Sequence, residues 1–363
     1  EIMKKLIMLL MSALLVLSMV GCTKKDTEID TLSIAFVPSK PADAILAAAE
    51  PLKDMLKEKL AAKGFVVNDV VITVGDNFAV VGEGMIAGSI DVGFLNSTTY
   101  IQYATGTDDS VVLLLEALRT GVGDAEGRVI MPSEGLDPWN SGITTDAKEL
   151  ASGYAGLVYV NIATEKGADI YAKAIAGTLT WEDVDTAKWN ASSVTSGSGF
   201  MYPSLWVDAL FGTGVGNEKK TIASLSNVVT DTPYSTMMTN LLTGQADIIV
   251  GYADIRKDAA STESFETAYA AEIAEGKYEN VWDIIKIIGV SDFIMNDCIA
   301  VANQSVDEKM TPEFCQALQE VFLEIGSTEE GLACVAPYAH AGYQVGADSD
   351  YNGTRAVAEL FKK

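Results

Sequence analysis

The chain has 363 residues, more than one domain usually contains, so we expect two lobes. Its composition is 48% hydrophobic and 21% charged, which is typical of a folded globular protein and excludes a largely disordered chain. The formal net charge of −25 argues against a nucleic-acid partner and against docking of the folded body on anionic lipid, because both need a basic surface.

The first residues have the pattern of an export signal. Lys4-Lys5 precedes an apolar run over residues 6–20, and Gly21-Cys22 follows. The run is shorter than the roughly 17–25 residues of a membrane-spanning helix. This pattern predicts a signal peptide over residues 1–21.

The junction at Cys22 resembles the lipobox of a bacterial lipoprotein, although Met19 stands where Leu is usual. The resemblance implies that Cys22 is lipidated and that residues 22–31 form a tether. The protein would then lie at the extracytoplasmic face of the cell membrane and touch the membrane through its lipid only. An ordinary signal peptide or an uncleaved anchor would account for the same run.

Three cysteines remain, namely Cys298, Cys315 and Cys334. An odd number does not form a disulfide framework, and with His340 as the single histidine a zinc site is not expected either. We interpret the three thiols as small buried hydrophobic groups. No cofactor and no metal are expected.

The body of the chain is predicted to alternate strands with helices. Strands are expected at residues 32–39, 65–75, 89–96, 156–164 and 189–194, and helices at residues 41–64, 78–88, 168–177 and 311–326. Pro51 is expected to kink or restart the first helix. Thr311 and Gly326 have the residue types that begin and end the last helix. The alternation predicts an α/β fold with largely parallel sheets.

The sequence also contains two segments that resemble each other. Residues 85–100 resemble residues 241–256, because each segment runs from an apolar helix end through Gly, two residues and Asp into an apolar strand. Two similar segments roughly 150 residues apart are expected if the protein has two similar lobes. The glycine-rich start of residues 119–180 is expected to cross between them.

Three junctions between a strand and a helix consist of small hydroxyl or amide residues. They are Asn96–Thr99, Ser196–Gly199 and Thr232-Pro233. Helix N-termini have unpaired N–H groups and a partial positive charge, so they bind anions without a cation. The same residue types are also ordinary helix caps, so capping without a ligand stays open.

From about Leu32 to its end, the chain resembles the phosphonate-binding proteins of ABC transporters, the PhnD-like family with the type II periplasmic-binding-protein fold. The resemblance is carried by EPLKDMLKEKL, AGSIDVGFLNSTTY, SVTSGSGFMYPSLWV, NLLTGQADIIVGYAD and DFIMNDCIAV. It implies two α/β lobes, each a mostly parallel sheet flanked by helices, with the ligand in the cleft between them. Lobe I would comprise residues 32–118 and 256–363, and lobe II residues 119–255.

The resemblance also implies a set of ligand-binding residues. The expected set is Phe78, Ser97, Thr98, Thr99, Tyr100, Ser196, Gly197, Ser198, Gly199, Tyr202, Thr232, Tyr234 and Asp254. Asp254 lies near the place where relatives direct a carboxylate toward the amine of the ligand. Phe78 stands where relatives often have a ligand-facing Tyr, and Tyr234 lies in a segment where many have a Ser-His pair.

The leading hypothesis is a solute-binding protein that closes two lobes around a small anionic or zwitterionic ligand of the phosphonate class and delivers it to an ABC transporter permease. The same fold could instead bind a sulfonate, a phosphite-type ion, or a vitamin precursor stacked on Phe78 and Tyr100. An enzyme would need a nucleophile beside a base, or a metal, and no such spacing is present. A surface adhesin would not explain why three helices begin with small hydroxyl or amide residues.

Overall fold

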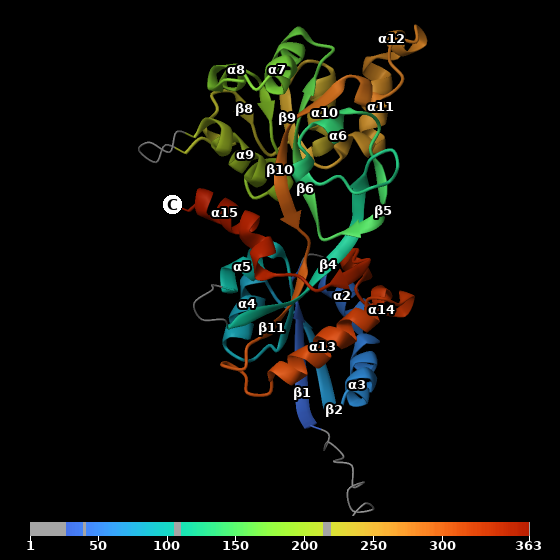
Figure 1. Ribbon diagram of the computed structural model, residues 1–363, viewed down its shortest axis with the longest axis vertical. Coiled ribbons are helices and arrows are strands. Elements are labelled where there is room, and N and C mark those ends of the chain that lie inside the picture. The colour runs from blue at the N-terminus through green and yellow to red at the C-terminus, as the bar shows by residue number, and fades with distance from the viewer. Residues whose placement is uncertain (1–26, 39–40, 105–109, 213–218, 363) are drawn as a thin grey trace, which may run out of the picture.

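The computed structural model describes residues 27–38, 41–104, 110–212 and 219–362, and every structural statement below concerns these residues. They form two lobes, one above the other in Figure 1, and each lobe is built on its own β-sheet. The expected signal peptide at residues 1–21 and the expected lipidation site Cys22 lie outside the described residues.

The first lobe contains a seven-stranded sheet in the order β12-β4-β11-β3-β1-β2, with β5 paired to β4 off this path. The strands are β1 (Thr27–Phe36), β2 (Phe65–Val74), β3 (Val92–Leu95), β4 (Val111–Gly123), β5 (Thr145–Ala151), β11 (Cys298–Ala302) and β12 (Gly342–Gln344). β1 is parallel to β2 and β3, whereas β11 is antiparallel to β3 and β4. β1 begins within the segment expected to be a tether, so the folded body starts before Leu32.

The second lobe contains a five-stranded sheet in the order β10-β6-β9-β7-β8. Its strands are β6 (Gly153–Asn161), β7 (Trp189–Asn190), β8 (Val228–Val229), β9 (Ile248–Tyr252) and β10 (Ile285–Met295). β7 is parallel to β8 and β9, whereas β6 is antiparallel to β9 and β10. Both sheets are therefore mixed and not mostly parallel, because β11 in the first sheet and β6 in the second run antiparallel to both of their neighbours.

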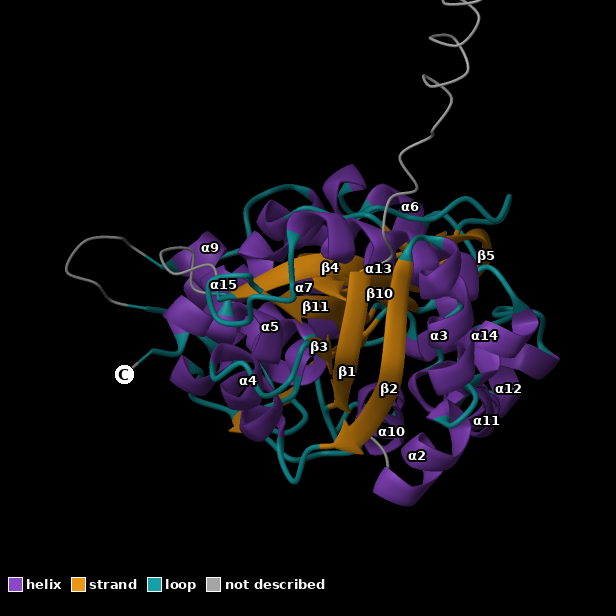
Figure 2. Cartoon of the chain, turned by 90° about the horizontal axis from the view of Figure 1, so that it is seen from below, coloured by secondary structure: helices purple, strands orange, loops and turns teal. Residues whose placement is uncertain are grey.

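Helices cover both faces of each sheet. In the first lobe, α4 and α5 lie on one side of β1 and α3 on the other (Figure 2). The helices of this lobe are α2 (Ala42–Ala49), α3 (Leu52–Ala62), α4 (Phe78–Ile86), α5 (Ser97–Tyr103), α13 (Pro312–Ile325) and α14 (Glu329–Ala333). Those of the second lobe are α6 (Asp137–Asn140), α7 (Glu165–Ile175), α8 (Trp181–Asp185), α9 (Tyr202–Phe211), α10 (Tyr234–Leu242), α11 (Ala259–Ala268) and α12 (Ala270–Ala274). The last helix, α15 (Asn352–Leu360), lies between the lobes beside α9 and α5 (Figure 1).

Short helical turns connect these elements. They are η1 (Pro132–Glu134), η2 (Gly197–Met201), η3 (Ile222–Ser224), η4 (Ile255–Lys257), η5 (Val281–Asp283), η6 (Ala336–Tyr338) and η7 (Asp348–Tyr351). η2 is a π-helical turn that runs directly into α9, and the others are 3₁₀ turns.

Local sequence signals account for the helix boundaries. Pro51 separates α2 from α3, as predicted. The Thr311 side chain accepts a hydrogen bond from Phe314 N at 3.2 Å and so caps α13, while Pro312 occupies the first helical position. The apolar face of α13 then buries Phe314, Leu318 and other residues in the core of the first lobe. Burial of this face, more than helix propensity, stabilises the helix.

The chain crosses between the lobes through β4 and returns between β10 and β11. Asn296 joins the two crossings, because its Nδ2 donates to Ala117 O at 3.1 Å and to Ala151 O at 2.9 Å. The predicted boundary, at which lobe I resumes at residue 256, differs from this place, since β10 pairs along its length with β6 of the second lobe. The second sheet therefore extends to Met295, and residues 256–295 belong with the second lobe.

Candidate functional site

The segment after β7 turns into α9 through η2. Ser196 Oγ accepts a hydrogen bond from Gly199 N at 3.1 Å, and Ser196 O accepts from Met201 N at 2.9 Å. The amide of Gly199 is therefore paired within the chain. A Cβ at Gly199 would lie 2.5 Å from Ser192 Cβ and 2.8 Å from the Tyr234 hydroxyl. Packing thus requires glycine at this position, and its paired amide differs from the expectation that the N–H groups of this junction are unpaired.

Four side chains bring hydroxyl groups together around this turn. The Tyr234 hydroxyl lies 3.1 Å from Ser196 Oγ and 3.2 Å from Ser198 Oγ. Tyr154, at the start of β6, lies two residues before Gly156, where a Cβ would lie 3.4 Å from Ser198 Cα. Burial, and next the proximity of Tyr234, raise the pKa of Tyr154, so this phenol keeps its proton at neutral pH. We refer to Ser196, Ser198, Tyr234 and Tyr154 as the hydroxyl cluster.

The hydroxyl cluster lies close to the place where the chain crosses between the lobes. Tyr154 follows Gly153, which pairs with Met295 at the end of β10. Asn296, in the return crossing, donates its backbone N–H to Ser152 O at 2.8 Å. Hydroxyl groups can donate to an oxyanion and accept from a protonated ligand, so the cluster can bind a small polar ligand without chemical change.

The first-lobe junction predicted to face the ligand is largely internal. Asn96 Oδ1 caps α5 by accepting from Thr99 N at 2.8 Å, and the side chains of Ser97 and Thr99 are buried. Tyr100 is 1% exposed and donates to Asp348 Oδ1 at 2.7 Å, so its phenol is engaged inside the first lobe. Thr98 differs, because it lines a hollow between α5 and α15.

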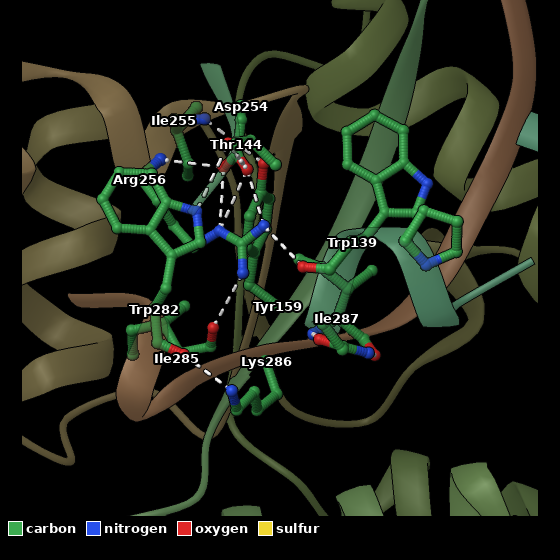
Figure 3. A network of polar contacts seen from close by, with 12 residues as sticks. Trp139, Thr144, Tyr159, Asp254, Ile255, Arg256, Trp282, Ile285, Lys286 and Ile287 are labelled. Atoms are coloured by element: carbon green, nitrogen blue, oxygen red, sulfur yellow. Dashed lines mark hydrogen bonds and ion pairs between the residues drawn. The ribbon is translucent and has the colours of Figure 1, made fainter. Parts of the chain in front are cut away.

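Asp254, predicted to face the amine of a ligand, is instead part of a buried ion pair (Figure 3). Its carboxylate accepts from Arg256 Nη2 at 2.6 Å and from Thr144 Oγ1 at 2.8 Å. The side chains of Asp254 and Arg256 are both 0% exposed. Arg256 further donates to the carbonyls of Trp139 and Ile285, each at 3.0 Å. The carboxylate is thus satisfied by protein groups, and Asp254 is a structural residue.

The other predicted residues lie apart from the hydroxyl cluster or at its edge. Tyr202 is 4% exposed, and its hydroxyl lies 2.8 Å from Thr354 Oγ1 on α15. Thr232 donates through its backbone N–H to Ala191 O at 3.1 Å, beside the start of η2. Phe78, at the first position of α4, is 37% exposed. Gly197 has open space around its Cα, with Ile294 Cγ2 at 3.7 Å from the position of a Cβ.

The sequence reasoning missed a polar group at the two crossings. Arg119 Nη2 donates to Asp297 Oδ2 at 2.8 Å, and His340 Nε2 lies 3.2 Å from the same oxygen. His340 Nδ1 lies 3.1 Å from the Tyr343 hydroxyl. Arg119 and Asp297 are 178 positions apart, so spacing contains no signal for the pair. The DFIMNDC segment containing Asp297 was nevertheless one of those that carried the resemblance.

These features define a class of protein. Two α/β lobes with mixed sheets, joined by adjacent crossings and with polar side chains where the lobes meet, form the type II periplasmic binding-protein fold. Residues 34–351 match the family described as "ABC transporter, phosphonate, periplasmic substrate-binding protein". The match covers most of the chain, and the chain therefore belongs to that family of extracytoplasmic binding proteins, which are not enzymes.

Two solved structures with TM-scores above 0.5 share the fold at low sequence identity, and a third solved structure is less similar. A Mycoplasma hyorhinis protein, Mh-p37, proposed to transport thiamine pyrophosphate, is 12% identical with a TM-score of 0.58, over 93% of this chain and 100% of that chain. A Xanthomonas citri protein bound to ATP is 12% identical with a TM-score of 0.51, over 92% and 100%. A Prochlorococcus marinus protein in complex with methylphosphonate is 9% identical with a TM-score of 0.45, over 91% and 97%. No curated protein matches the sequence.

Two further observations bear on the predictions. Cys298 and Cys334 are buried free thiols, as predicted, whereas Cys315 is a free thiol that is only half-buried. Among the described residues, none of the helices combines the length and the apolar character needed to cross a bilayer.

Proposed function

We propose that this protein captures a small phosphonate-like oxyanion outside the cytoplasm and delivers it to the permease of an ABC importer. The ligand would bind between the lobes and stabilise a closed form by contacting both of them, as in hinge-closing binding proteins. The observation that carries the proposal is the convergence of the Ser196, Ser198 and Tyr234 hydroxyls beside the lobe crossings, in a chain of this family.

The ligand class can be tested with a thermal-shift screen followed by calorimetric titration. The probes are methylphosphonate, 2-aminoethylphosphonate, phosphite, phosphate, methanesulfonate and thiamine pyrophosphate. A ligand that binds only the folded state at a hundredfold its Kd adds about 2.7 kcal/mol of stability, so it must raise the melting temperature. We expect a phosphonate or phosphite to give the largest shift, and the absence of any shift with these probes would contradict the proposal.

A second candidate is a larger ligand that stacks an aromatic ring, such as a vitamin precursor. The 37% exposure of Phe78 favours this alternative, because an aromatic face accessible to solvent can stack on a ligand ring. Tyr100, the second predicted stacking residue, is buried and cannot contribute its ring. A melting-temperature increase with thiamine pyrophosphate, together with none from the small oxyanions, would favour the larger ligand.

We further propose that Cys22 carries the lipid that anchors the protein to the cell membrane. The support is the basic start, the apolar run and the Gly21-Cys22 junction of the sequence. Mass spectrometry of the mature protein should find a lipid-modified N-terminal Cys22, and Cys22→Ala should release the protein from the membrane fraction or stall its processing. A mature chain that begins elsewhere, or that carries no lipid, contradicts the anchor.

A further inference from the structure

Arg119 lies where the two crossings of the chain meet. It is near the lobe-crossing end of β4, where it pairs with Ala151 of β5. Its Nη2 donates to Asp297 in the return crossing. The Arg119 side chain is 35% exposed, so the fold does not enclose it completely.

The hydrogen bonds of Arg119 are incomplete. A guanidinium has five N–H donors, and within the described part of the chain Arg119 donates one hydrogen bond, to Asp297. Its Nε is buried and has no partner among the described residues. Arg256 shows the contrast (Figure 3), because its Nε and Nη2 both bind Asp254 and its remaining contacts are to two carbonyls. Arg256 is satisfied by the fold, whereas Arg119 retains donors that the fold does not use.

Asp297 and His340 hold the Arg119 guanidinium in place. Asp297 has its carbonyl bonded by Ala117 N at 2.9 Å, and its Oδ2 contacts both Arg119 and His340. The His340 side chain is 0% exposed and packs against Tyr343 at a ring-centroid distance of 5.6 Å. A donor fork anchored at one end by a fixed carboxylate is pre-organised for a second anion at its other end.

Arg119 also lies near the hydroxyl cluster of the second lobe. The positive charge of Arg119 lowers the pKa of Tyr154, against the larger effect of burial that raises it. Arg119 pairs with Ala151, three residues before Tyr154. Gly156, two residues after Tyr154, packs against Ser198. The cation of the crossing and the hydroxyl groups of the second lobe are therefore neighbours that come from different elements.

The overall charge of the chain does not assist the binding of an anion. The chain has a net charge of −25, and its exposed charges are screened beyond roughly 8 Å at physiological salt. An oxyanion between the lobes thus gains its electrostatic stabilisation from groups in direct contact. Hydrogen bonds from a charged donor are about twice as strong as those between neutral groups.

We infer that Arg119 is the fixed cation of the ligand site, and that its unused N–H groups bind the charged oxygens of the ligand. Asp297 and His340 are positioning residues that orient the guanidinium. This inference rests on the proposed function and adds to it the group that distinguishes ligands by charge. A ligand with two negative charges should gain more from Arg119 than a ligand with one.

The inference is tested by calorimetric titration of methylphosphonate and methanesulfonate. Both are of similar size, but at pH 8.5 methylphosphonate carries close to two negative charges and methanesulfonate one. The proteins are the wild type, Arg119→Gln, Arg119→Lys and the control Arg128→Gln. Arg128 is a matched control because it is also paired with carboxylates, Asp124 and Glu134, and its loss changes the net charge by the same amount.

We expect Arg119→Gln to weaken methylphosphonate binding by about ten- to a hundredfold, the range of a lost charged hydrogen bond. The loss for methanesulfonate should be smaller, so the ratio of the two affinities falls. Arg119→Lys should retain part of the affinity, and Arg128→Gln should stay within about twofold of the wild type.

The results that would contradict the role of Arg119 differ from those that would contradict the proposed function. Wild-type binding that survives in Arg119→Gln, or that falls equally in Arg119→Gln and Arg128→Gln, overturns the role of Arg119 and leaves the proposed function standing. A wild type that binds neither probe contradicts the proposed oxyanion specificity itself. If Arg119→Gln does not fold, Arg119→Lys decides, because a purely structural role predicts equal losses for the two ligands.

Discussion

Gly199 and Gly197 are two residues apart in the same turn, yet the structure assigns them different roles. A Cβ at Gly199 would meet Ser192 and Tyr234, whereas a Cβ at Gly197 would meet only Ile294 Cγ2, at 3.7 Å. Glycine is therefore needed at Gly199 for packing inside the second lobe. At Gly197 it leaves space beside the hydroxyl cluster, which a ligand could occupy.

The two glycines form a matched pair for a stability measurement. Gly199→Ala should lower the free energy of unfolding by about 1–3 kcal/mol, the usual cost of forcing an extra methyl group into a packed site. Gly197→Ala should change it by less than about 1 kcal/mol, because the site is open. Urea denaturation of both variants measures the difference, and equal losses would contradict the packing argument.

Asp254 shows how burial changes the role of a residue. A carboxylate that contacts Arg256 and Thr144 at 0% exposure cannot also bind the amine of a ligand. Removing one partner of a buried ion pair leaves the other charge uncompensated, which is costly. The arginine would lose the acceptor for two of its nitrogen atoms.

Asp254→Asn should therefore lower the free energy of unfolding by about 3–5 kcal/mol. The exposed Asp292 provides the control, since Asp292→Asn should change stability by less than about 0.5 kcal/mol. Thermal unfolding measures both. If Asp254→Asn kept its melting temperature but lost preference for 2-aminoethylphosphonate over methylphosphonate, the carboxylate would be a ligand group after all.

At the scale of elements, α15 joins the two lobes a third time. Its Thr354 contacts Tyr202 on α9, while Arg355 donates to Asp348 O at 2.8 Å in the first lobe. Lys219 Nζ donates to the last carbonyls of the helix, on Glu359 and Leu360, at 3.0 and 2.9 Å. A cation at the C-terminal end of a helix stabilises the helix dipole.

Tyr202→Phe should weaken the contact between α9 and α15 and should leave the affinity for the ligand unchanged. The variant removes the hydroxyl that lies 2.8 Å from Thr354 Oγ1 but keeps the buried ring. A lost neutral hydrogen bond of this kind costs about 1 kcal/mol of stability. Calorimetric titration with the ligand identified by the screen should give an unchanged affinity. An affinity loss at constant stability would return Tyr202 to the ligand site.

The two similar sequence segments, residues 85–100 and 241–256, also correspond to similar structures. Gly88 and Gly244 both adopt positive φ, +70° and +71°, where each ends a helix. Asp91 then accepts from Ser33 N at 2.6 Å, and Asp247 accepts from Lys188 N at 2.8 Å. In each lobe the aspartate thus ties the start of one strand to its parallel neighbour. The repeated sequence corresponds to a repeated connection between helix and sheet.

For the whole molecule, stability should depend on pH through Glu116. Glu116 lies in β4 of the first sheet, and Gln344 Nε2 donates to its Oε2 at 2.8 Å. Burial raises the pKa of Glu116 from its ordinary value of 4.5 to about 7. Between these values the folded state binds more protons than the unfolded state, so the free energy of unfolding decreases as the pH rises.

We expect this residue to make the protein less stable by about 2–3 kcal/mol at pH 7.5 than at pH 4.5, at about 1.4 kcal/mol per pKa unit. Glu116→Gln cannot titrate and should flatten that part of the profile. Urea unfolding at intervals across this range, for the wild type and the variant, isolates the contribution of Glu116. Parallel profiles would show that the carboxyl ionises normally in the folded protein.

The sequence by itself determined the local structure, the two-lobed α/β fold and the family. Helix caps such as Thr311, the break at Pro51 and the positive-φ glycines depend on interactions within a few residues, so a local pattern is sufficient to predict them. The capping of α14 shows the limit of this precision: Ser327 and Glu330 stand at the spacing of a capping box, but the cap is Thr328. A one-residue error is within the range by which helix ends are uncertain.

Only the tertiary structure decided which polar residues are satisfied inside the fold and which are left to bind. Arg119 meets Asp297 across 178 positions, and β10 joins the second sheet although it follows the predicted return to the first lobe. Asp254 and Arg256 are close in sequence, but whether they face solvent or each other depends on the elements that cover them. Burial and long-range pairing depend on which strands and helices become neighbours in the folded protein. A local sequence pattern does not specify these neighbours.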